Sequence, residues 1–190
     1  MLKKEARNIY KSKRIELPLV ERNKLDDLLL IQLQNLSLRQ DTHLLLSYWP
    51  LERYGEPNTL LYTRYLEHAI PALKISFPVV DFKTSELEAV LVHEDSDFVE
   101  NTYGIPEPEE GEKIGSEEID IIFVPLLAFD KKGFRVGYGK GFYDKFLKTC
   151  REDVLSIGFS YFEPIEEIED RNQFDVPLNY CITPHKIYEF

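Results

Sequence analysis

The sequence predicts an α/β protein with a largely parallel central sheet. Apolar, β-branched segments alternate along the chain with segments of helical periodicity, as they do in proteins built from strand–helix–strand units. The predicted strands are apolar throughout, which is typical of strands that are buried on both faces. At 190 residues the chain is long enough for one core and short for two, so we expect a single domain over residues 1–190.

The N-terminal segment is expected to form an amphipathic helix over residues 2–16. Its apolar side chains share one side, and cations lie along another, namely Lys3, Arg7, Lys11 and Arg14. Such a stripe is ordinarily a solvated face, but cations without a carboxylate between them repel one another. A bound anion would relieve that repulsion, so the stripe is either solvent-facing or part of an anion site.

Pro18 ends this helix, and a second helix is expected from 20 to 36. Its leucines at helical spacing should face inward, namely Leu25, Leu28, Leu29 and Leu33. The apolar run 43–49, closed by Pro50, then predicts a strand.

Asn58 is a favourable residue for a helix start, and a helix is expected after it as far as Ala69. Strands are expected at 72–80 and at 85–94, the second of them near a sheet edge. Glycine, proline and glutamate dominate residues 95–118, which predicts a loop.

Residues 119–125 form an apolar, β-branched run that predicts a strand buried on both faces. A basic loop follows, and glycines then occupy alternate positions, Gly137, Gly139 and Gly141, before a helix that is expected to begin at Phe142. Glycines let the backbone approach a ligand closely and adopt positive φ. A strand, a glycine turn and a helix start together direct backbone N–H groups at an anion.

Charged side chains flank this turn. Arg135 and Lys140 supply two cations, and Asp144 stands where a carboxylate could hold a divalent metal. The turn departs from the dinucleotide-binding pattern because Phe142 replaces its third glycine, and from the P-loop because no Ser or Thr follows Lys140. A plain glycine-rich turn with a solvated lysine stays an alternative. With its cations and its carboxylate, the pattern predicts a site for a metal-bound polyphosphate.

Beyond the glycine turn the chain predicts a further strand at 153–159 and then becomes acidic. The net charge is −11, yet residues 1–24 hold eight basic and three acidic side chains, a local +5 that leaves −16 for the remainder. A basic N-terminal segment on an acidic protein favours a small anionic ligand over nucleic acid, whose long backbone an acidic surface would repel.

No apolar run approaches the length of a membrane span, and the N-terminus lacks the apolar stretch of a signal peptide. Cys150 and Cys181 lack metal-ligand spacing and the four histidines are scattered, so reduced thiols and no zinc site are expected. These features predict a cytoplasmic protein that does not bind membranes.

The segment 124–147, VPLLAFDKKGFRVGYGKGFYDKFL, resembles the signature of the 5-formyltetrahydrofolate cyclo-ligases, also called methenyltetrahydrofolate synthetases. In that family a strand ending in V-P-x-x-A-F-D leads through a basic turn into G-x-G-x-G-[YF]-Y-D. Further matches follow the family's order: a K-x-x-x-R pattern at 3–7, E-x-x-T at 56–59, an aromatic-glycine element at 103–108 and H-D-x-x-[LV]-D-x-[IV]-[VL]-T at 174–183. The likeness covers nearly the whole chain.

The resemblance implies an ATP site built from the N-terminal cations and the glycine turn, namely Lys3, Lys4, Arg7, Arg135, Gly137, Tyr138, Gly139, Lys140, Gly141, Phe142 and Tyr143. It implies catalytic roles for Lys140, Arg135 and Tyr143, and magnesium ligation by Asp144 and Asp175. Phe174 and Asn179 depart from the family pattern, so their roles stay open, as do those of Lys11 and Arg14.

On the folate side the resemblance implies contacts from Arg7, Trp49, Glu56, Tyr138, Gly139, Lys140, Gly141 and Phe142. A carboxylate such as Glu56 suits a pterin, whose 2-amino and N3 groups are adjacent donors. The alternative for Trp49 is plain core, and for Glu56 a solvated surface carboxylate. For residues 103–108 a plain loop stays as open as a pocket wall.

The resemblance further implies a three-layer fold shared with sugar-phosphate isomerases and coenzyme A transferases. The implied activity is that of a ligase of folate one-carbon metabolism, which converts 5-formyltetrahydrofolate to 5,10-methenyltetrahydrofolate with ATP and Mg²⁺. A monomer is expected, acting on a small-molecule folate with or without a polyglutamate tail. Two alternatives are a non-catalytic folate- or nucleotide-binding protein on the same fold and a sugar-phosphate isomerase of this architecture.

Overall fold

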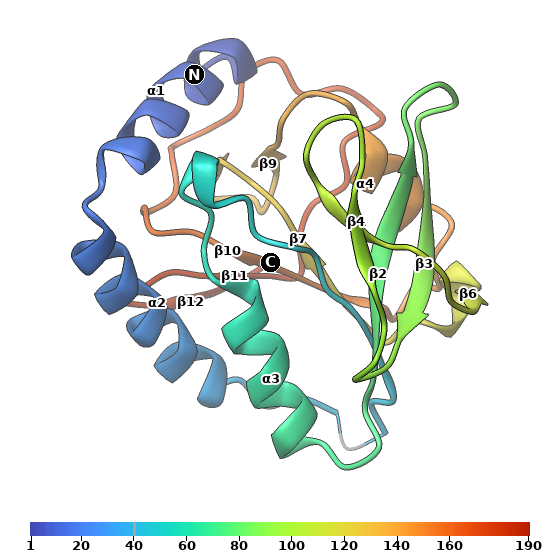
Figure 1. Cartoon of the computed structure of the whole chain (residues 1–190). Coiled ribbons are helices and arrows are strands. Elements are labelled where there is room, and N and C mark those ends of the chain that lie inside the picture. The colour runs from blue at the N-terminus through green and yellow to red at the C-terminus, as the bar shows by residue number, and fades with distance from the viewer. Residues whose placement is uncertain (40) are drawn as a thin grey trace.

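The computed structural model describes residues 1–39 and 41–190 (Figure 1). Its α-helices are α1 (Lys3–Glu16), α2 (Leu19–Gln34), α3 (Thr59–Ala69) and α4 (Phe142–Leu147), with short 3₁₀ helices η1 (Glu52–Tyr54) and η2 (Ser116–Glu118). The main sheet contains β1 (Leu44–Leu46), β2 (Lys74–Asp81), β3 (Glu86–Val92), β6 (Lys113–Ile114), β7 (Ile121–Val124), β10 (Leu155–Phe159), β11 (Tyr180–Ile182) and β12 (Ile187–Glu189). Two small sheets pair β4 (Phe98–Glu100) with β5 (Pro106–Pro108) and β8 (Ala128–Phe129) with β9 (Arg135–Val136).

The strand order in the main sheet is β12-β11-β10-β7-β1-β2-β3-β6. The inner strands from β11 to β2 run parallel to one another, whereas β12 on one edge and β3 and β6 on the other pair antiparallel. The prediction of an α/β fold with a largely parallel sheet is therefore confirmed.

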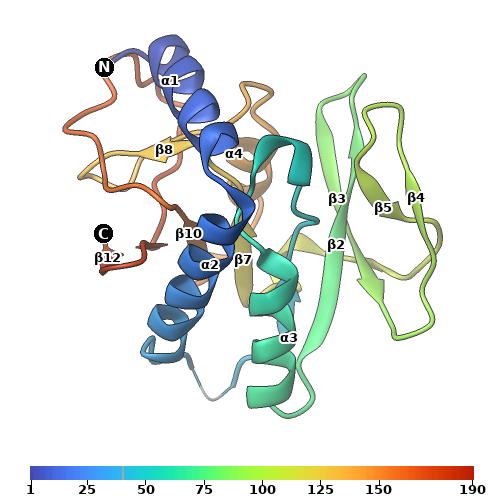
Figure 2. The ribbon, with the colours of Figure 1, turned by 60° about the vertical axis from the view of Figure 1, so that its left-hand side comes forward.

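Helices cover both faces of this sheet, because successive strand side chains point to opposite faces. Leu45 of β1 packs in one cluster with Leu29 of α2 and Tyr62 of α3. Its neighbour Leu46 packs in a second cluster with Phe146 of α4. Both views show α2 and α3 side by side on their face (Figures 1 and 2). The result is three layers, helix, sheet and helix, as expected.

The first helix docks at a different place, against the small β8–β9 hairpin. Ala6 and Tyr10 of α1 are buried in a third cluster with Leu127, Ala128 and Val136. The other side of α1 therefore lies beside the segment that follows β9, which is the glycine turn. This docking brings the N-terminal cations to the predicted anion site.

Two expectations need correction. Leu28 does not face inward: it is 38% exposed, because the groove between α2 and the sheet is filled by Leu29 and Leu33. Residues 95–118 are also not a plain loop, since they include the β4–β5 hairpin, β6 and η2. In the part of the chain that the structure describes, no helix combines the length and the apolar character that crossing a membrane requires.

Candidate active site

A cavity of about 970 Å³ opens at the carboxyl ends of the parallel strands. Its lining includes Trp49 beyond β1, Pro78 and Val80 of β2, and Pro125 immediately after β7. Ligands of open α/β sheets bind at this end of the strands, where the connecting loops converge. The cavity therefore lies where a largely parallel sheet is expected to bind its ligand.

The glycine turn forms one wall of the cavity. Gly139 and Gly141 have φ of +93° and +76°, a region that side chains rarely adopt. A Cβ at Gly139 would also lie 3.3 Å from the guanidinium carbon of Arg7, whose Nε donates a hydrogen bond of 2.8 Å to the Gly137 carbonyl. Because α4 has only six residues, the turn itself, and not a long helix dipole, offers N–H groups to a ligand.

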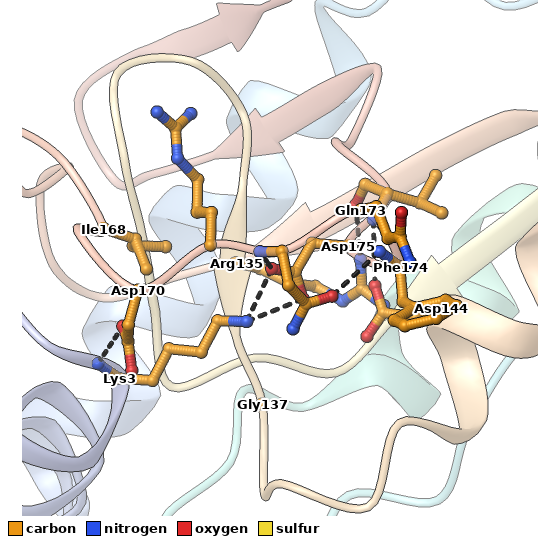
Figure 3. A network of polar contacts seen from close by, with 12 residues as sticks. Lys3, Arg135, Gly137, Asp144, Ile168, Asp170, Gln173, Phe174 and Asp175 are labelled. Carbon is orange, nitrogen blue, oxygen red and sulfur yellow. Dashed lines mark hydrogen bonds and ion pairs between the residues drawn. The ribbon is translucent and has the colours of Figure 1, made fainter.

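Two ion pairs lie side by side near the Gly137 end of the turn (Figure 3). Lys3 Nζ donates to both carboxylate oxygens of Asp175, at 2.7 and 2.6 Å, and joins α1 to the segment before β11. Arg135 Nη2 lies 3.1 Å from Asp144 Oδ1. The Val176 backbone connects the pairs: its N–H donates to Asp144 at 3.0 Å, and its carbonyl accepts from Arg135 at 2.8 Å.

Arg135 is the most enclosed of these charges, with its side chain 4% exposed. Burial lowers the pKa of Arg135 from its usual value, and the adjacent Asp144 carboxylate opposes that shift. The guanidinium is therefore a fixed positive group at the base of the cavity. An anionic ligand could bind to it without the cost of ordering a flexible side chain.

The two carboxylates are the predicted magnesium ligands. Among residues 1–39 and 41–190 no cluster of three or more His, Cys, Asp or Glu side chains is placed to hold a metal. Magnesium, however, is usually held by one or two carboxylates, water and substrate phosphates, so Asp144 and Asp175 fit a metal that arrives with a polyphosphate. Asp144 makes both of its described contacts through Oδ1, while Asp175 already binds Lys3 through both oxygens.

The opposite part of the cavity is aromatic. Trp49 is half-buried and packs against Phe98, with ring centroids 4.9 Å apart, and also lines the cavity. Phe82, which follows β2, contacts Tyr103 at 3.9 Å and Phe142 at 5.3 Å between ring centroids. These rings form a wall that suits a flat organic ligand beside the cationic turn.

Glu56 lies between the two parts and is not a solvated surface carboxylate. Its side chain is 3% exposed; Oε2 accepts from the Leu51 N–H at 2.7 Å, and Oε1 accepts from the Tyr138 hydroxyl. Burial raises the pKa of Glu56, and nearby Arg14 opposes the shift. Tyr143 also lines the cavity, and burial raises the pKa of its hydroxyl well above the usual value.

The structure brings nearly all of the predicted site residues to this one cavity. Its lining includes Lys3, Arg7, Trp49, Glu56, Arg135, Gly137, Tyr138, Gly139, Lys140, Gly141, Phe142, Tyr143, Asp144 and Asp175. Lys4 is the exception: it is exposed on α1 and is not part of the lining. Tyr103, Ile105 and Pro106 also line the cavity, so the segment 103–108 is a wall of the pocket.

Of the residues whose roles the sequence left open, Lys11 and Phe174 line the cavity and Asn179 does not. Lys11 lines the cavity with its ammonium 4.5 Å from the Tyr54 ring centroid, and Phe174 lines it beside Lys148. Asn179 lies outside the lining and binds Ser156 of β10, accepting through Oδ1 from the backbone N–H and from the hydroxyl at 2.8 Å each. Its amide therefore links β10 to the start of β11.

Sequence reasoning missed several members of the lining, namely Tyr54, Phe82, Lys145, Lys148, Asp170 and Asn172. Lys145 lies on α4 and Lys148 is its C-cap. Both follow Asp144 closely in the sequence, so they could have been predicted to lie near the cavity. Phe82 lies opposite Phe142 because the pairing of β2 with β3 continues to Asp81, beyond the residues of β2 that pair with β1, and no local sequence pattern shows this.

The fold and the site together define a class of protein: an α/β protein in which one cavity combines a cationic glycine turn, suited to a polyanion, with an aromatic wall, suited to a flat ligand. A family model described as the 5-formyltetrahydrofolate cyclo-ligase family matches residues 4–184. The chain therefore belongs to that family, as its sequence signature predicted.

Individual relatives agree with the family model. A 5-formyltetrahydrofolate cyclo-ligase of Mycoplasma genitalium is 39% identical over 70 residues, which are 36% of this chain and 42% of the relative. One of Escherichia coli K12 is 29% identical over 121 residues, 62% of this chain and 66% of the relative. The chain thus aligns with less than two thirds of the length of either protein. A solved structure of Aquifex aeolicus 5,10-methenyltetrahydrofolate synthetase covers all of this chain and 93% of its own, with a TM-score of 0.81 and 31% identity.

Proposed function

We propose that this protein catalyses the ATP-dependent closure of 5-formyltetrahydrofolate to 5,10-methenyltetrahydrofolate, with release of ADP and phosphate. One observation carries the proposal: the glycine turn, two cation–carboxylate pairs and an aromatic wall share a single cavity in a member of this family. The cavity has the volume of a site for small organic ligands, and its two parts match a polyphosphate and a pterin.

The chemistry explains why both parts are needed. An N-formyl group is an amide and therefore a poor electrophile, and ring closure must expel its oxygen. If that oxygen attacks the γ-phosphorus of ATP, ADP leaves and the oxygen becomes part of a phosphate ester. N10 then attacks the activated carbon, loses its proton, and phosphate departs with the former formyl oxygen. The protein need only align the reactants and neutralise charge on the transferring phosphoryl group.

Four cations are proposed to hold the phosphates: Lys3, Arg7, Arg135 and Lys140. Arg135 is fixed by its contacts, whereas Lys140 is exposed on the glycine turn and free to adjust to a ligand. Charge-assisted hydrogen bonds of this kind are the strongest that side chains make to phosphate. Each cation would stabilise the negative charge that is shared among the phosphoryl oxygens during transfer.

Asp144 and Asp175 are proposed to hold Mg²⁺, which when bound with ATP would supply further neutralisation of phosphate charge. Without ligand, each carboxylate neutralises a cation of the same site, Asp144 through Arg135 and Asp175 through Lys3. Arg135, the most buried of the four cations, therefore has a compensating carboxylate before any ligand binds, and so has Lys3.

Tyr143 is proposed to assist the reaction as a hydrogen-bond donor. Because burial raises the pKa of its hydroxyl, the phenol stays protonated at neutral pH and cannot serve as a general base. A neutral phenol can still donate to an oxygen on which negative charge develops. On the folate side, Trp49 and Phe142 would contact the ring system, and Glu56 would accept from the donors of the pterin.

The test is an absorbance assay for methenyltetrahydrofolate with purified protein, 5-formyltetrahydrofolate, Mg²⁺ and ATP. The expected result is product formation that requires ATP and yields one phosphate for each product molecule. Binding of both ligands without turnover would indicate a non-catalytic binding protein, and turnover of a sugar phosphate without ATP would indicate an isomerase. The further expectations of a monomer, a cytoplasmic location and tolerance of a polyglutamate tail belong to the same proposal; light scattering tests the first.

A further inference from the structure

Arg14 is a buried cation that the proposed reaction does not use. It lies on α1, on the same helix as Lys3 and Arg7, but its side chain is only 3% exposed and does not line the cavity. An arginine is almost never buried to this extent unless each of its donors has a partner. Its partners therefore indicate what it does.

Three separate segments of the cavity wall accept hydrogen bonds from Arg14. Its Nε donates to the Tyr54 carbonyl in η1 at 2.7 Å, and its Nη1 donates to the Leu126 carbonyl beyond β7 at 3.0 Å. Its Nη2 donates to the hydroxyl of Tyr138 in the glycine turn. The planar guanidinium fixes these three directions at once, which a lysine ammonium on a flexible stem would not do.

The hydrogen bonds continue from Tyr138 to Glu56. The Tyr138 hydroxyl accepts from Arg14 and donates to Glu56 Oε1, and Arg14 Nη2 itself lies 3.8 Å from that oxygen. A cation, a hydroxyl and a carboxylate in series polarise one another, so each bond strengthens the next. The Leu51 N–H holds the other oxygen at 2.7 Å. Both oxygens of Glu56 are thus oriented, and each keeps a lone pair for a ligand.

We infer that Arg14 is a positioning residue which, through the Tyr138 hydroxyl, holds Glu56 ionised and oriented toward the pterin of the substrate. The inference rests on the proposed function, because it holds that these hydrogen bonds serve the binding of folate and not the binding of ATP. The physical reason is that a buried carboxylate favours its protonated form unless a cation compensates the lost hydration. A protonated Glu56 would present an O–H donor to the N–H donors of a pterin, and recognition would fail.

The test separates this role from simple support of the fold. Tyr138→Phe removes only the hydroxyl, and the Arg14 contacts to Tyr54 and Leu126 can persist, so the variant should fold. Calorimetric titration with 5-formyltetrahydrofolate alone should show affinity weakened on the order of tenfold, as expected for one hydrogen bond to a charged group. Affinity for a non-hydrolysable ATP analogue should change less than the folate affinity, because the substitution keeps the backbone N–H groups of the glycine turn.

A double-mutant cycle measures the coupling energy between Tyr138 and Glu56 in folate binding. A purely structural role of Tyr138 would give no such coupling. If Tyr138 acts through Glu56, Tyr138→Phe should cost little more once Glu56→Gln has removed the charge. Arg14→Lys keeps the charge but not the three hydrogen bonds, so it should bind folate more weakly than wild type and more tightly than Arg14→Met. Lys13→Met, which removes the adjacent exposed cation of α1, serves as the matched control and should bind both ligands as wild type does.

Equal weakening for both ligands, additive effects in the cycle, or an unchanged folate affinity in Tyr138→Phe would overturn the inference while wild-type turnover stands. Failure of the proposed function looks different: wild-type protein would form no methenyltetrahydrofolate with ATP. If wild-type protein also did not bind 5-formyltetrahydrofolate, both the proposed function and this inference would be overturned.

Discussion

Replacing Asp144 with asparagine tests the ion pair and the proposed metal site in one variant. Asparagine keeps an oxygen that can accept from the Val176 N–H and from Arg135, now at 3.0 and 3.1 Å. What it removes is the negative charge beside a guanidinium that is 4% exposed. The variant should therefore fold with the same contacts while each of these two hydrogen bonds becomes weaker.

The magnitude follows from those two bonds. A hydrogen bond to a charged group contributes about 1.5–3 kcal/mol and one between neutral groups about 0.5–1.5 kcal/mol, so the Val176 bond should lose roughly 1 kcal/mol. The Arg135 bond keeps its charged donor but loses the attraction of the carboxylate, which contributes about 1 kcal/mol for a partly exposed pair. The free energy of unfolding should fall by about 2 kcal/mol. Complete loss of a partner from a buried pair costs more, about 3–5 kcal/mol, but here the oxygen remains and the Asp144 side chain is 26% exposed. The corresponding fall in Tm is roughly 4–8 °C for a domain of this size.

Urea unfolding without ligands measures the first effect, and turnover at limiting Mg²⁺ measures the second. We expect the Mg²⁺ concentration for half-maximal turnover to rise at least about tenfold, because one of two charged ligands is lost. Asp95→Asn, in the exposed turn after β3, is the matched control and should stay within about 0.5 kcal/mol of wild type. Wild-type turnover at limiting Mg²⁺ would show that Asp144 does not hold the metal. An unfolding free energy equal to that of the control would refute the ion-pair reasoning.

Three further substitutions test other parts of the cavity. Lys140→Met should lower kcat/KM for ATP roughly tenfold to a hundredfold, the effect of one charge-assisted contact, and an unchanged value would mark Lys140 as a solvated surface lysine. Gly139→Ala should lower the free energy of unfolding by about 1–2 kcal/mol, because alanine must adopt a φ of +93° and its Cβ meets Arg7 at 3.3 Å; urea unfolding that matches wild type would contradict this. Trp49→Phe should raise the KM for 5-formyltetrahydrofolate more than the KM for ATP, and 5-formyltetrahydrofolate without ATP should change the emission of this one tryptophan. Neither change would be seen if Trp49 only packs against Phe98 in the core.

Features with a local cause could be predicted from the sequence. The apolar run 119–125 had to be a strand, and the glycines after it had to be a turn, because each depends on neighbouring residues alone. The position of the cavity followed from these, since parallel strands end at one edge of the sheet. The β4–β5 hairpin was missed because each of its strands has three residues, two of them prolines in β5, which is too short for any periodicity to show.

Features that depend on distant partners could not be predicted. Arg14 and Arg7 belong to the same charged stripe, yet only Arg14 is buried, because α1 turns it toward carbonyls 40 and 112 residues away. The pairing of Lys3 with Asp175 could not be predicted from the sequence either. Lys3 was expected to bind ATP and Asp175 to bind magnesium, and nothing in the sequence indicated that they contact each other. Their mutual contact shows that Lys3 and Asp175 neutralise each other before any ligand binds.

That same contact sets the order in which the protein can mature during synthesis. Lys3 and Asp175 are 172 positions apart, and a ribosome adds about 5–20 residues per second, so roughly 10–35 seconds separate the two. Throughout that interval Lys3 lacks its acidic partner, although the β8–β9 hairpin on which α1 docks is translated before Asp175. The parallel core strands β1, β2, β7 and β10 are all translated before Asp175, so a nascent chain can acquire much of its sheet while the part of the cavity beside the Lys3–Asp175 pair is still incomplete.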